Sequence, residues 1–393
     1  MKKFLSNFKF YIPGIVLFYF NQDVVIWSAQ DLSIAWILYL IQVLALAYFY
    51  IKPKQQKLHY GLLVLLFIIT LLVGLVHEFT SPTYLYKLFM YIMIFSMMRS
   101  LSFEDLQVSF YKVTFFFAVL SLGFYVCSGV LGIGGLLPVS FLGGAGASYS
   151  TNFLYSQLTE WAVRNCGIFR EPGVYQIYLN IALLFYYNQN RNLLITPISI
   201  VLMLATITTL SSAGIVIMVT IVLMQYMQHT NRSLKSTILL VIFGFVASSI
   251  IMSNFDAIFY KIQSGVDESG SVFARYYSLI VPMRIWSDYP IFGCGAAEFN
   301  DLLYYYPING ERMHPGLITN CFTVNFATSG LFVGLLYLFA VISGTIKQCN
   351  KYRYPLIAAV LVLILFSCEG IMYSCIFNLL LVGGLCLNKK RIV

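Results

Sequence analysis

Long apolar stretches separated by short polar linkers make up most of this chain. A helix needs about 20 apolar residues to cross a bilayer core of about 30 Å, because each residue adds about 1.5 Å. The stretches that meet this length, some of them marginally, are 10–27, 32–51, 60–76, 84–98, 110–131, 173–188, 193–210, 212–229, 237–253, 321–346, 354–369 and 371–387. We therefore predict an all-α fold, a polytopic membrane helical bundle of about 12 (10–12) transmembrane helices that forms a single integral membrane domain over residues 1–393.

Two pairs of these stretches are joined by very tight turns. The pair at 194–229 turns at Ser211-Ser212, and the pair at 354–387 turns at Glu369-Gly370. The two stretches of each pair could either both cross the membrane completely or form a re-entrant hairpin that enters and leaves on the same side. Because both arms of a hairpin return to the same side, the orientation of the other spans does not depend on this choice. The first stretch is not followed by a small-residue cleavage site, so we expect a retained helix there.

Composition indicates that the chain lies in a membrane, and the distribution of charge predicts its orientation there. With 60% hydrophobic and 10% charged residues, it has too little polar surface for a water-soluble globule of 393 residues. If the amino terminus is cytoplasmic, 17 of the 24 lysines and arginines fall in cytoplasmic linkers. The positive-inside rule then places both termini in the cytoplasm. These cations form no run interleaved with aromatic residues, so we expect no nucleic-acid partner.

This orientation leaves two long loops outside, at 132–172 and 254–319. Long loops among short linkers usually carry function. The first begins with a cluster of glycines, which predicts irregular backbone. The second contains a mostly apolar stretch from Val272 to Trp286, which we predict to be an interfacial helix interrupted near Pro282. No internal repeat is visible, so the two-half arrangement of many secondary transporters lacks support.

Cations on the external side need a local explanation. The external loops carry Arg164, Arg170, Lys261, Arg275, Arg284 and Arg312. Arginine forks bind a diphosphate bidentately, and a diphosphate is a natural ligand for an outward-facing membrane enzyme. Alternatively, these side chains pair with loop carboxylates such as Glu160, Glu171 and Asp267, or cover lipid headgroups.

Glu171 and His314 are the candidate proton acceptors. Arg170-Glu171-Pro172-Gly173 predicts a turn at the membrane edge, while Pro172 can equally start the next helix with Glu171 at its positive end. His314 is the only histidine in a long external loop; it titrates near neutrality and can accept a proton from a sugar hydroxyl, or it can be an incidental interfacial residue.

The eight cysteines show no metal-binding spacing, so we expect no metal site. Cys166 and Cys294 both fall in external loops, where a disulfide between them is chemically allowed. The sequence leaves that pairing open.

Three stretches carry a likeness to a known family. They are Gly167 to Gly173 with its Phe-Arg-Glu-Pro, Ser271 to Phe299 with Arg275 followed by Tyr-Pro-Ile-Phe-Gly-Cys-Gly, and His314 to Gly330. In these stretches the chain resembles the superfamily of O-antigen polymerases (Wzy type) and O-antigen ligases, polytopic membrane proteins that transfer glycans. The run from Thr208 to Gly214 is similar to a short Ser/Gly signature of that family, although Ala213 stands where many relatives have arginine.

The resemblance implies a function and a site. It implies a polymerase that joins undecaprenyl-diphosphate-linked oligosaccharide repeat units into O-antigen or capsular or exopolysaccharide at the outer, periplasmic face of a bacterial inner (plasma) membrane. Arg275 would bind the lipid diphosphate with Arg170 and Arg284 as helpers, and His314, with Glu171, would activate the acceptor. No cofactor, metal or nucleotide sugar is implied; a chain-length regulator and a flippase are the expected protein partners.

Two other functions stay open. An O-antigen ligase, which transfers glycan to lipid A core, would use much the same apparatus. A flippase for lipid-linked oligosaccharide typically has twelve spans. Most predicted spans have no charged residue deep within them, but Asp23 and Glu369 are exceptions that would suit a transport path. The two long external loops and the arginines within them favour the enzymes.

Overall fold

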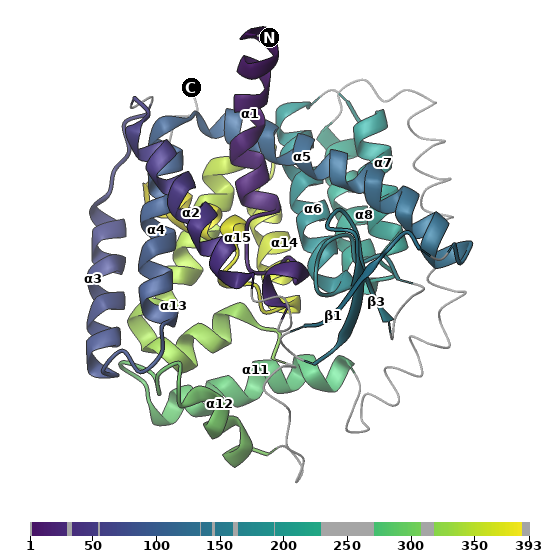
Figure 1. The fold of residues 1–393 in the computed structure, drawn as a ribbon. Helices are drawn as coiled ribbons and strands as arrows, with labels where there is room; N and C mark the ends of the chain where they lie inside the picture. Colours follow the sequence, from purple (N-terminus) through teal and green to yellow (C-terminus); the bar gives the residue numbers. More distant parts are fainter. Residues whose placement is uncertain are drawn as a thin grey trace.

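The computed structural model describes residues 2–29, 34–53, 56–133, 135–143, 146–159, 164–191, 193–228, 271–307 and 318–386. This part of the chain is mostly helical (Figure 1). The α-helices are α1 (Lys2–Phe18), α2 (Ala35–Ile51), α3 (Gly61–Val76), α4 (Thr83–Ser100), α5 (Phe103–Phe124), α6 (Pro172–Gln189), α7 (Pro197–Thr208), α8 (Ser212–Gln228), α11 (Ser271–Asp288), α12 (Phe299–Leu302), α13 (Cys321–Gln348), α14 (Pro355–Cys368) and α15 (Cys375–Cys386). Short helical turns are η1 (Val25–Ser28), η2 (Tyr125–Val130) and η5 (Leu303–Tyr305).

Every predicted span in the described part overlaps one helix; the span at 237–253 lies outside the described residues. Two helical segments, Phe103–Val130 and Cys321–Gln348, are long and apolar enough to cross a membrane. Other apolar helices have only 10–17 residues, including both arms of the pairs around Ser211 and Glu369. How many helices cross the bilayer therefore remains a prediction.

The linkers between helices gather at two ends of the molecule. At one end, the start of α3 meets the end of α15, where His59 N donates to Cys386 O at 2.9 Å. The turn between α13 and α14 lies at this end too. There, Lys351 Nζ lies 3.2 Å from Glu104 Oε1 at the start of α5. In Figure 1 the beginning of α1 is at the top, whereas α11 and α12 lie at the bottom. Helices α1 to α8 run alternately down and up in Figure 1, whereas α11 lies across the lower end.

The first helix ends earlier than the predicted span of 10–27. Asn21 Nδ2 donates to Phe18 O at 2.7 Å, which satisfies a carbonyl that the helix end leaves without a partner. The chain then turns at residues 20–24 and continues as η1. The predicted boundary is wrong because a polar side chain ends the helix inside the apolar run.

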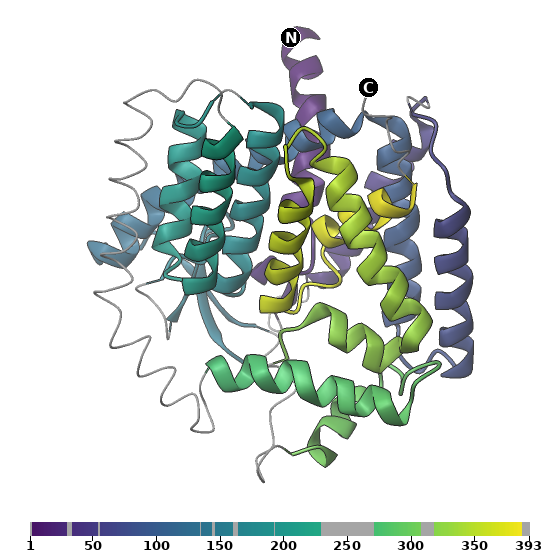
Figure 2. The same cartoon turned by 180° about the vertical axis from the view of Figure 1, so that it is seen from behind.

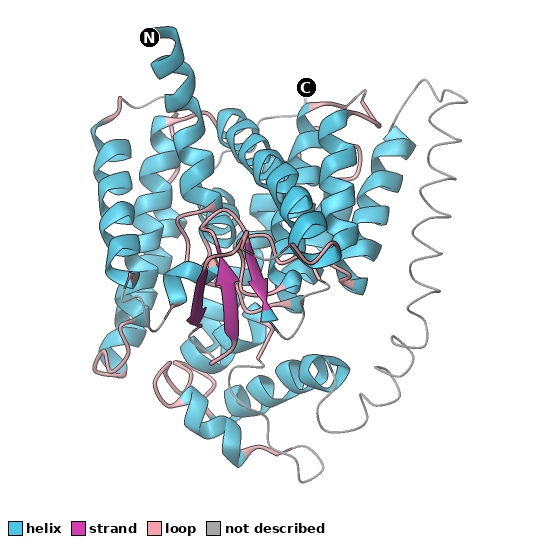
Figure 3. Ribbon diagram, turned by 45° about the vertical axis from the view of Figure 1, so that its right-hand side comes forward, coloured by secondary structure: helices cyan, strands magenta, loops and turns pink. Residues whose placement is uncertain are grey.

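The external loop at 132–172 is more regular than predicted. Strands β1 (Val139–Leu142), β2 (Ser148–Thr151) and β3 (Ser156–Leu158) form an antiparallel sheet in the order β1-β2-β3 (Figure 3). Phe141 and Tyr149 are paired in register, and their rings stack at 5.7 Å on the buried face. Short polar and apolar alternation produces this sheet, so the prediction of irregular backbone is wrong for residues 139–158. The predicted all-α fold is confirmed in the coarser form of a mostly helical fold.

Helix α11 is continuous, so the predicted interruption near Pro282 is wrong. A proline inside a helix removes the hydrogen bond to the carbonyl four residues earlier. That carbonyl belongs to Ser278, and it accepts a hydrogen bond from Thr323 Oγ1 on α13 at 2.7 Å. A neighbouring helix thus supplies the donor that Pro282 lacks.

Large apolar side chains remain exposed along the outer helices. On α2, Trp36 is 79% and Ile51 81% exposed, and Leu75 at the end of α3 is 57% exposed. Figures 1 and 2 both show α3 at the edge of the bundle. An apolar surface this extensive is typical of a face that contacts lipid or another protein.

Candidate functional site

The segment from Gly167 to Gly173 is held in place by its aromatic residue. Phe169 is fully buried, stacked on Tyr178 at 4.3 Å and edge-on to Phe18 at 5.2 Å. Gly167 has φ +59°, and a Cβ there would meet the Tyr175 ring at 2.9 Å. Anchoring Phe169 in the core leaves Arg170 fixed where the loop meets α6.

Arg170 is tied to three parts of the chain. Its backbone N donates to Asp23 O at 3.3 Å, and its carbonyl accepts from Tyr149 Oη at 2.9 Å. Its Nη2 donates to Gly370 O at 3.1 Å, in the turn between α14 and α15. Its Nε is buried without a hydrogen-bond partner among the described residues. The guanidinium thus donates to a backbone carbonyl and keeps further donor capacity.

Glu171 and Glu369 meet at the start of α6. Glu171 is the residue before the helix, Pro172 begins it, and Gly173 follows. A Cβ on Gly173 would lie 2.0 Å from Glu369 Oε1, so only glycine leaves room for that carboxyl group. Helix α14 ends at Cys368, and Glu369 has extended backbone. The Pro-Gly pair therefore starts the helix and also makes space for a second acid.

Arg164 joins this region from the end of the sheet-containing loop. Its Nε donates to Thr209 O at 3.0 Å, while Asn165 Nδ2 donates to Thr208 Oγ1 at 2.9 Å. The turn between α7 and α8, within the Thr208–Gly214 run, thus supports Arg164.

Helix α11 brings Arg275 to the same group of charges. Arg164, Arg170, Glu171 and Arg275 all interact electrostatically with the Glu369 carboxyl group. We call these five side chains the arginine–glutamate cluster. Burial and then the charge of Glu171 raise the pKa of Glu369, the three arginines lower it, and the net result is a pKa of about 8.

The cluster combines three cations with two acids but holds them apart. Among the described side chains of Arg170, Glu171, Arg275 and Glu369, no two form an ion pair with one another. Burial lowers the pKa of Arg164. Burial also acts to lower the pKa of Arg170, but Asp23 and the two glutamates raise it by more. Asp23 therefore lies beside the cluster as a further acid that acts on Arg170.

Not every predicted site residue belongs to the cluster. Arg284 lies nine residues after Arg275 on α11, which at about 100° per residue places it on the opposite face of the helix, and it is exposed. His314 lies outside the described residues. The structure therefore groups Arg170, Glu171 and Arg275, adds Arg164 and Glu369, and separates Arg284.

The second family-like stretch fastens α11 to α13. Helix α13 breaks at Gly330, which has φ +79° and ψ −175°. The freed groups are satisfied by the loop after α11: Cys294 N donates to Ala327 O at 2.8 Å, and Leu331 N donates to Pro290 O at 2.9 Å. The Tyr-Pro-Ile-Phe-Gly-Cys-Gly stretch thus binds α13 through backbone hydrogen bonds and holds α11, the helix that carries Arg275, in place.

Cys166 and Cys294 are both buried and free, so the disulfide left open by the sequence does not form. Cys166 packs with the sheet, whereas Cys294 packs beneath α11. The two residues support different elements.

No protein-family model matches the chain, and no curated protein matches it.

Proposed function

We propose that this protein is a membrane glycosyltransferase of the bacterial inner membrane that polymerises undecaprenyl-diphosphate-linked oligosaccharide units at the outer face. The observation that carries the proposal is the arginine–glutamate cluster, in which Arg164 and Arg170 from the loop before α6 and Arg275 from α11 act on one buried carboxyl group. Three guanidinium groups can each bind diphosphate oxygens bidentately.

Glycosyl transfer from a diphosphate donor requires only two further functions from the protein. A glycosyl diphosphate contains its own leaving group, so the site must stabilise the charge that develops on the diphosphate while a base takes the proton of the acceptor hydroxyl. Arg164, Arg170 and Arg275 supply the first role. His314, or Glu171 at the start of α6, supplies the second.

Arg275 tests the diphosphate site. We expect Arg275→Ala to abolish long-chain glycan and Arg275→Lys to restore it only partly, because an ammonium keeps the charge but loses the fork. The matched control is Arg284→Ala, which removes the same group from the opposite face of the same helix and should leave chain length unchanged. Chain length is read on gels at equal levels of inserted protein. A normal length distribution in Arg275→Ala would remove this residue from the site.

The base is tested with purified protein and lipid-linked repeat units. His314→Ala should reduce turnover by about 10²- to 10⁴-fold while leaving donor affinity nearly unchanged, as expected when a general base is lost. Near-normal turnover in this variant, together with a large loss in Glu171→Gln, would assign the base to Glu171.

A ligase and a flippase are separated from a polymerase by the glycan of a deletion strain. Loss of a polymerase leaves single-repeat glycan on the surface lipid. Loss of a ligase leaves lipid-linked polymer, and loss of a flippase leaves lipid-linked units inside. Only the first outcome supports the proposal.

A further inference from the structure

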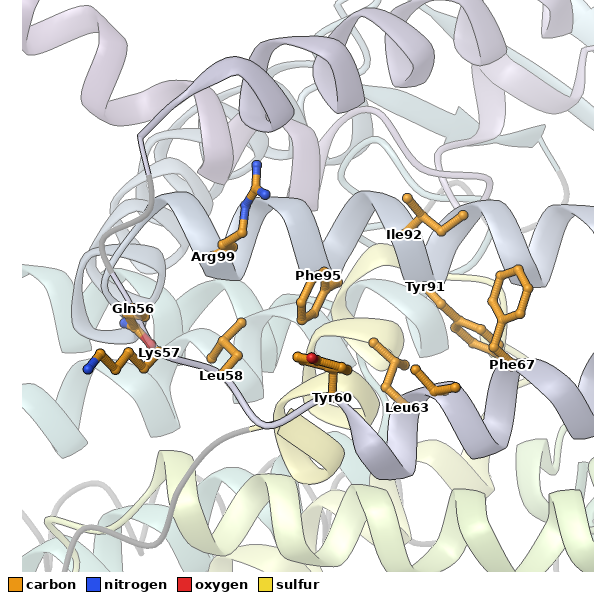
Figure 4. Close-up of a pocket in the computed structure, with 11 residues that line it drawn as sticks. Gln56, Lys57, Leu58, Tyr60, Leu63, Phe67, Tyr91, Ile92, Phe95 and Arg99 are labelled. Atoms are coloured by element: carbon orange, nitrogen blue, oxygen red, sulfur yellow. The ribbon is translucent and has the colours of Figure 1, made fainter.

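A cavity of about 810 Å³ lies between the start of α3 and the second half of α4 (Figure 4). Cavities of about 300–1,000 Å³ are typical of small-molecule sites. Its walls are mostly aliphatic and aromatic, formed by Tyr60, Leu63, Phe67, Tyr91, Ile92 and Phe95. It lies at the end of the molecule where His59 meets Cys386, the end opposite to the arginine–glutamate cluster.

The cavity has one basic end. Lys57 and Arg99 line it there, and no acidic residue is among the described residues that line it. Arg99 Nη2 donates to Tyr50 O at 2.6 Å, but its buried Nε has no hydrogen-bond partner in the described part of the chain. Lys57 is exposed. In Figure 4 both basic residues lie toward the end of the cavity at Gln56 and Leu58, with the Arg99 guanidinium pointing up from α4 and the Lys57 side chain extending to the left.

The apolar end opens toward the surface that we expect to face lipid. Val64 lines the cavity and is 45% exposed, and its neighbours Leu65 and Ile68 on α3 are 44% and 48% exposed. A ligand here would have a negatively charged head and an apolar tail that enters sideways from the bilayer.

We propose that this cavity binds an anionic phospholipid, with its phosphate at Lys57 and Arg99 and part of one acyl chain between α3 and α4. Charge complementarity selects this occupant: two cations without a lining acid favour a net negative headgroup over a zwitterionic one. The site is independent of the proposed enzymatic activity and lies at the other end of the molecule.

The test compares phosphatidylglycerol with phosphatidylcholine of identical acyl chains, titrated into the full-length protein and followed by native mass spectrometry. We expect phosphatidylglycerol to bind about 10- to 30-fold more tightly, the effect of two interfacial cations. The double variant Lys57→Gln/Arg99→Gln should remove the difference, whereas Arg353→Gln, which removes a cation at the same end but outside the cavity, should keep it.

The apolar part is tested by filling the cavity. Val64→Trp should weaken binding of both lipids, and Leu65→Trp, an equally exposed position on α3 outside the cavity lining, should not. Equal affinity for the two lipids in the wild type, or unchanged selectivity in the double variant, would overturn the proposal. Tighter binding of undecaprenyl phosphate than of phosphatidylglycerol would also overturn it and assign the cavity to the carrier lipid.

Discussion

Glu369 gives the arginine–glutamate cluster a charge that depends on pH. Burial and the nearby Glu171 raise the pKa of Glu369 to about 8, so the carboxyl group is protonated at neutral pH and ionises above it. Once ionised, Glu369 adds a negative charge beside Arg164, Arg170 and Arg275. It then competes with an anionic ligand for the same cations.

We therefore expect affinity for a short-chain polyprenyl diphosphate to fall as pH rises through about 8, by about 10-fold for one added charge. Glu369→Gln stays neutral at every pH and should bind the diphosphate equally well on both sides of this value. Isothermal titration calorimetry of purified protein between pH 6.5 and about 9.5 measures both curves.

Glu104→Gln is the control for this pH dependence, because Glu104 pairs with Lys351 at the other end of the molecule. This variant should keep the wild-type curve. If Glu369→Gln shows the same pH dependence as the wild type, the titrating group is a different residue.

At the scale of elements, the break in α13 decides how α11 is held. Gly330 has a backbone conformation that is essentially restricted to glycine, and a Cβ there would lie 2.0 Å from Ile291 O. Any side chain at this position would push the loop after α11 away. Arg275 depends on this contact, although it lies on a different helix.

Gly330→Ala should therefore lower thermal stability, by about 1–3 kcal/mol from backbone strain alone. The control is Gly123→Ala in α5, where a Cβ meets nothing within 4 Å and alanine favours the helix. Melting of the detergent-purified proteins, followed by dye fluorescence, compares the two. Equal melting temperatures for Gly330→Ala and the wild type would contradict this role for the break.

Apolar periodicity predicted where helices lie much better than where they end. Asn21 ends the first helix by bonding Phe18 O, a contact that no count of apolar residues contains. Pro282 signals a break in the sequence, but Thr323, forty-one residues later, compensates for it. The sheet at 139–158 rests on pairing between strands of only three or four residues, too short to stand out from a glycine-rich loop.

The candidate site was only partly visible in the sequence for the same reason. Arg170 and Glu171 are adjacent in a recognisable turn, and Arg275 stood out as a cation on the disfavoured side. Glu369 stood out only as an acid at a tight turn, and nothing local linked it to Arg170 and Glu171; the link is the space that Gly173 leaves beside α6. Contacts between distant segments cannot be read from spacing alone.

At the scale of the whole molecule, the two ends differ in chemistry. One end carries the basic cavity at Lys57 and Arg99, and the other carries the arginine–glutamate cluster and the sheet. If the first end is cytoplasmic, a lipid site and a transfer site face opposite leaflets of one bilayer. The assignment of sides comes from the distribution of cations and needs a direct test.

Single cysteines labelled from outside intact spheroplasts provide that test. Ser148→Cys in β2 and Asn350→Cys between α13 and α14 are both exposed positions, one at each end of the molecule. The native cysteines give little background, since seven are buried and only Cys127 is partly exposed, and Cys127→Ser removes it. A membrane-impermeant maleimide should label Ser148→Cys from outside and Asn350→Cys only after the membrane is opened. The reverse pattern would invert the protein and place the arginine–glutamate cluster in the cytoplasm, where it could not meet an externally displayed saccharide. Labelling of both positions from outside would contradict the alternating arrangement of the helices across the bilayer.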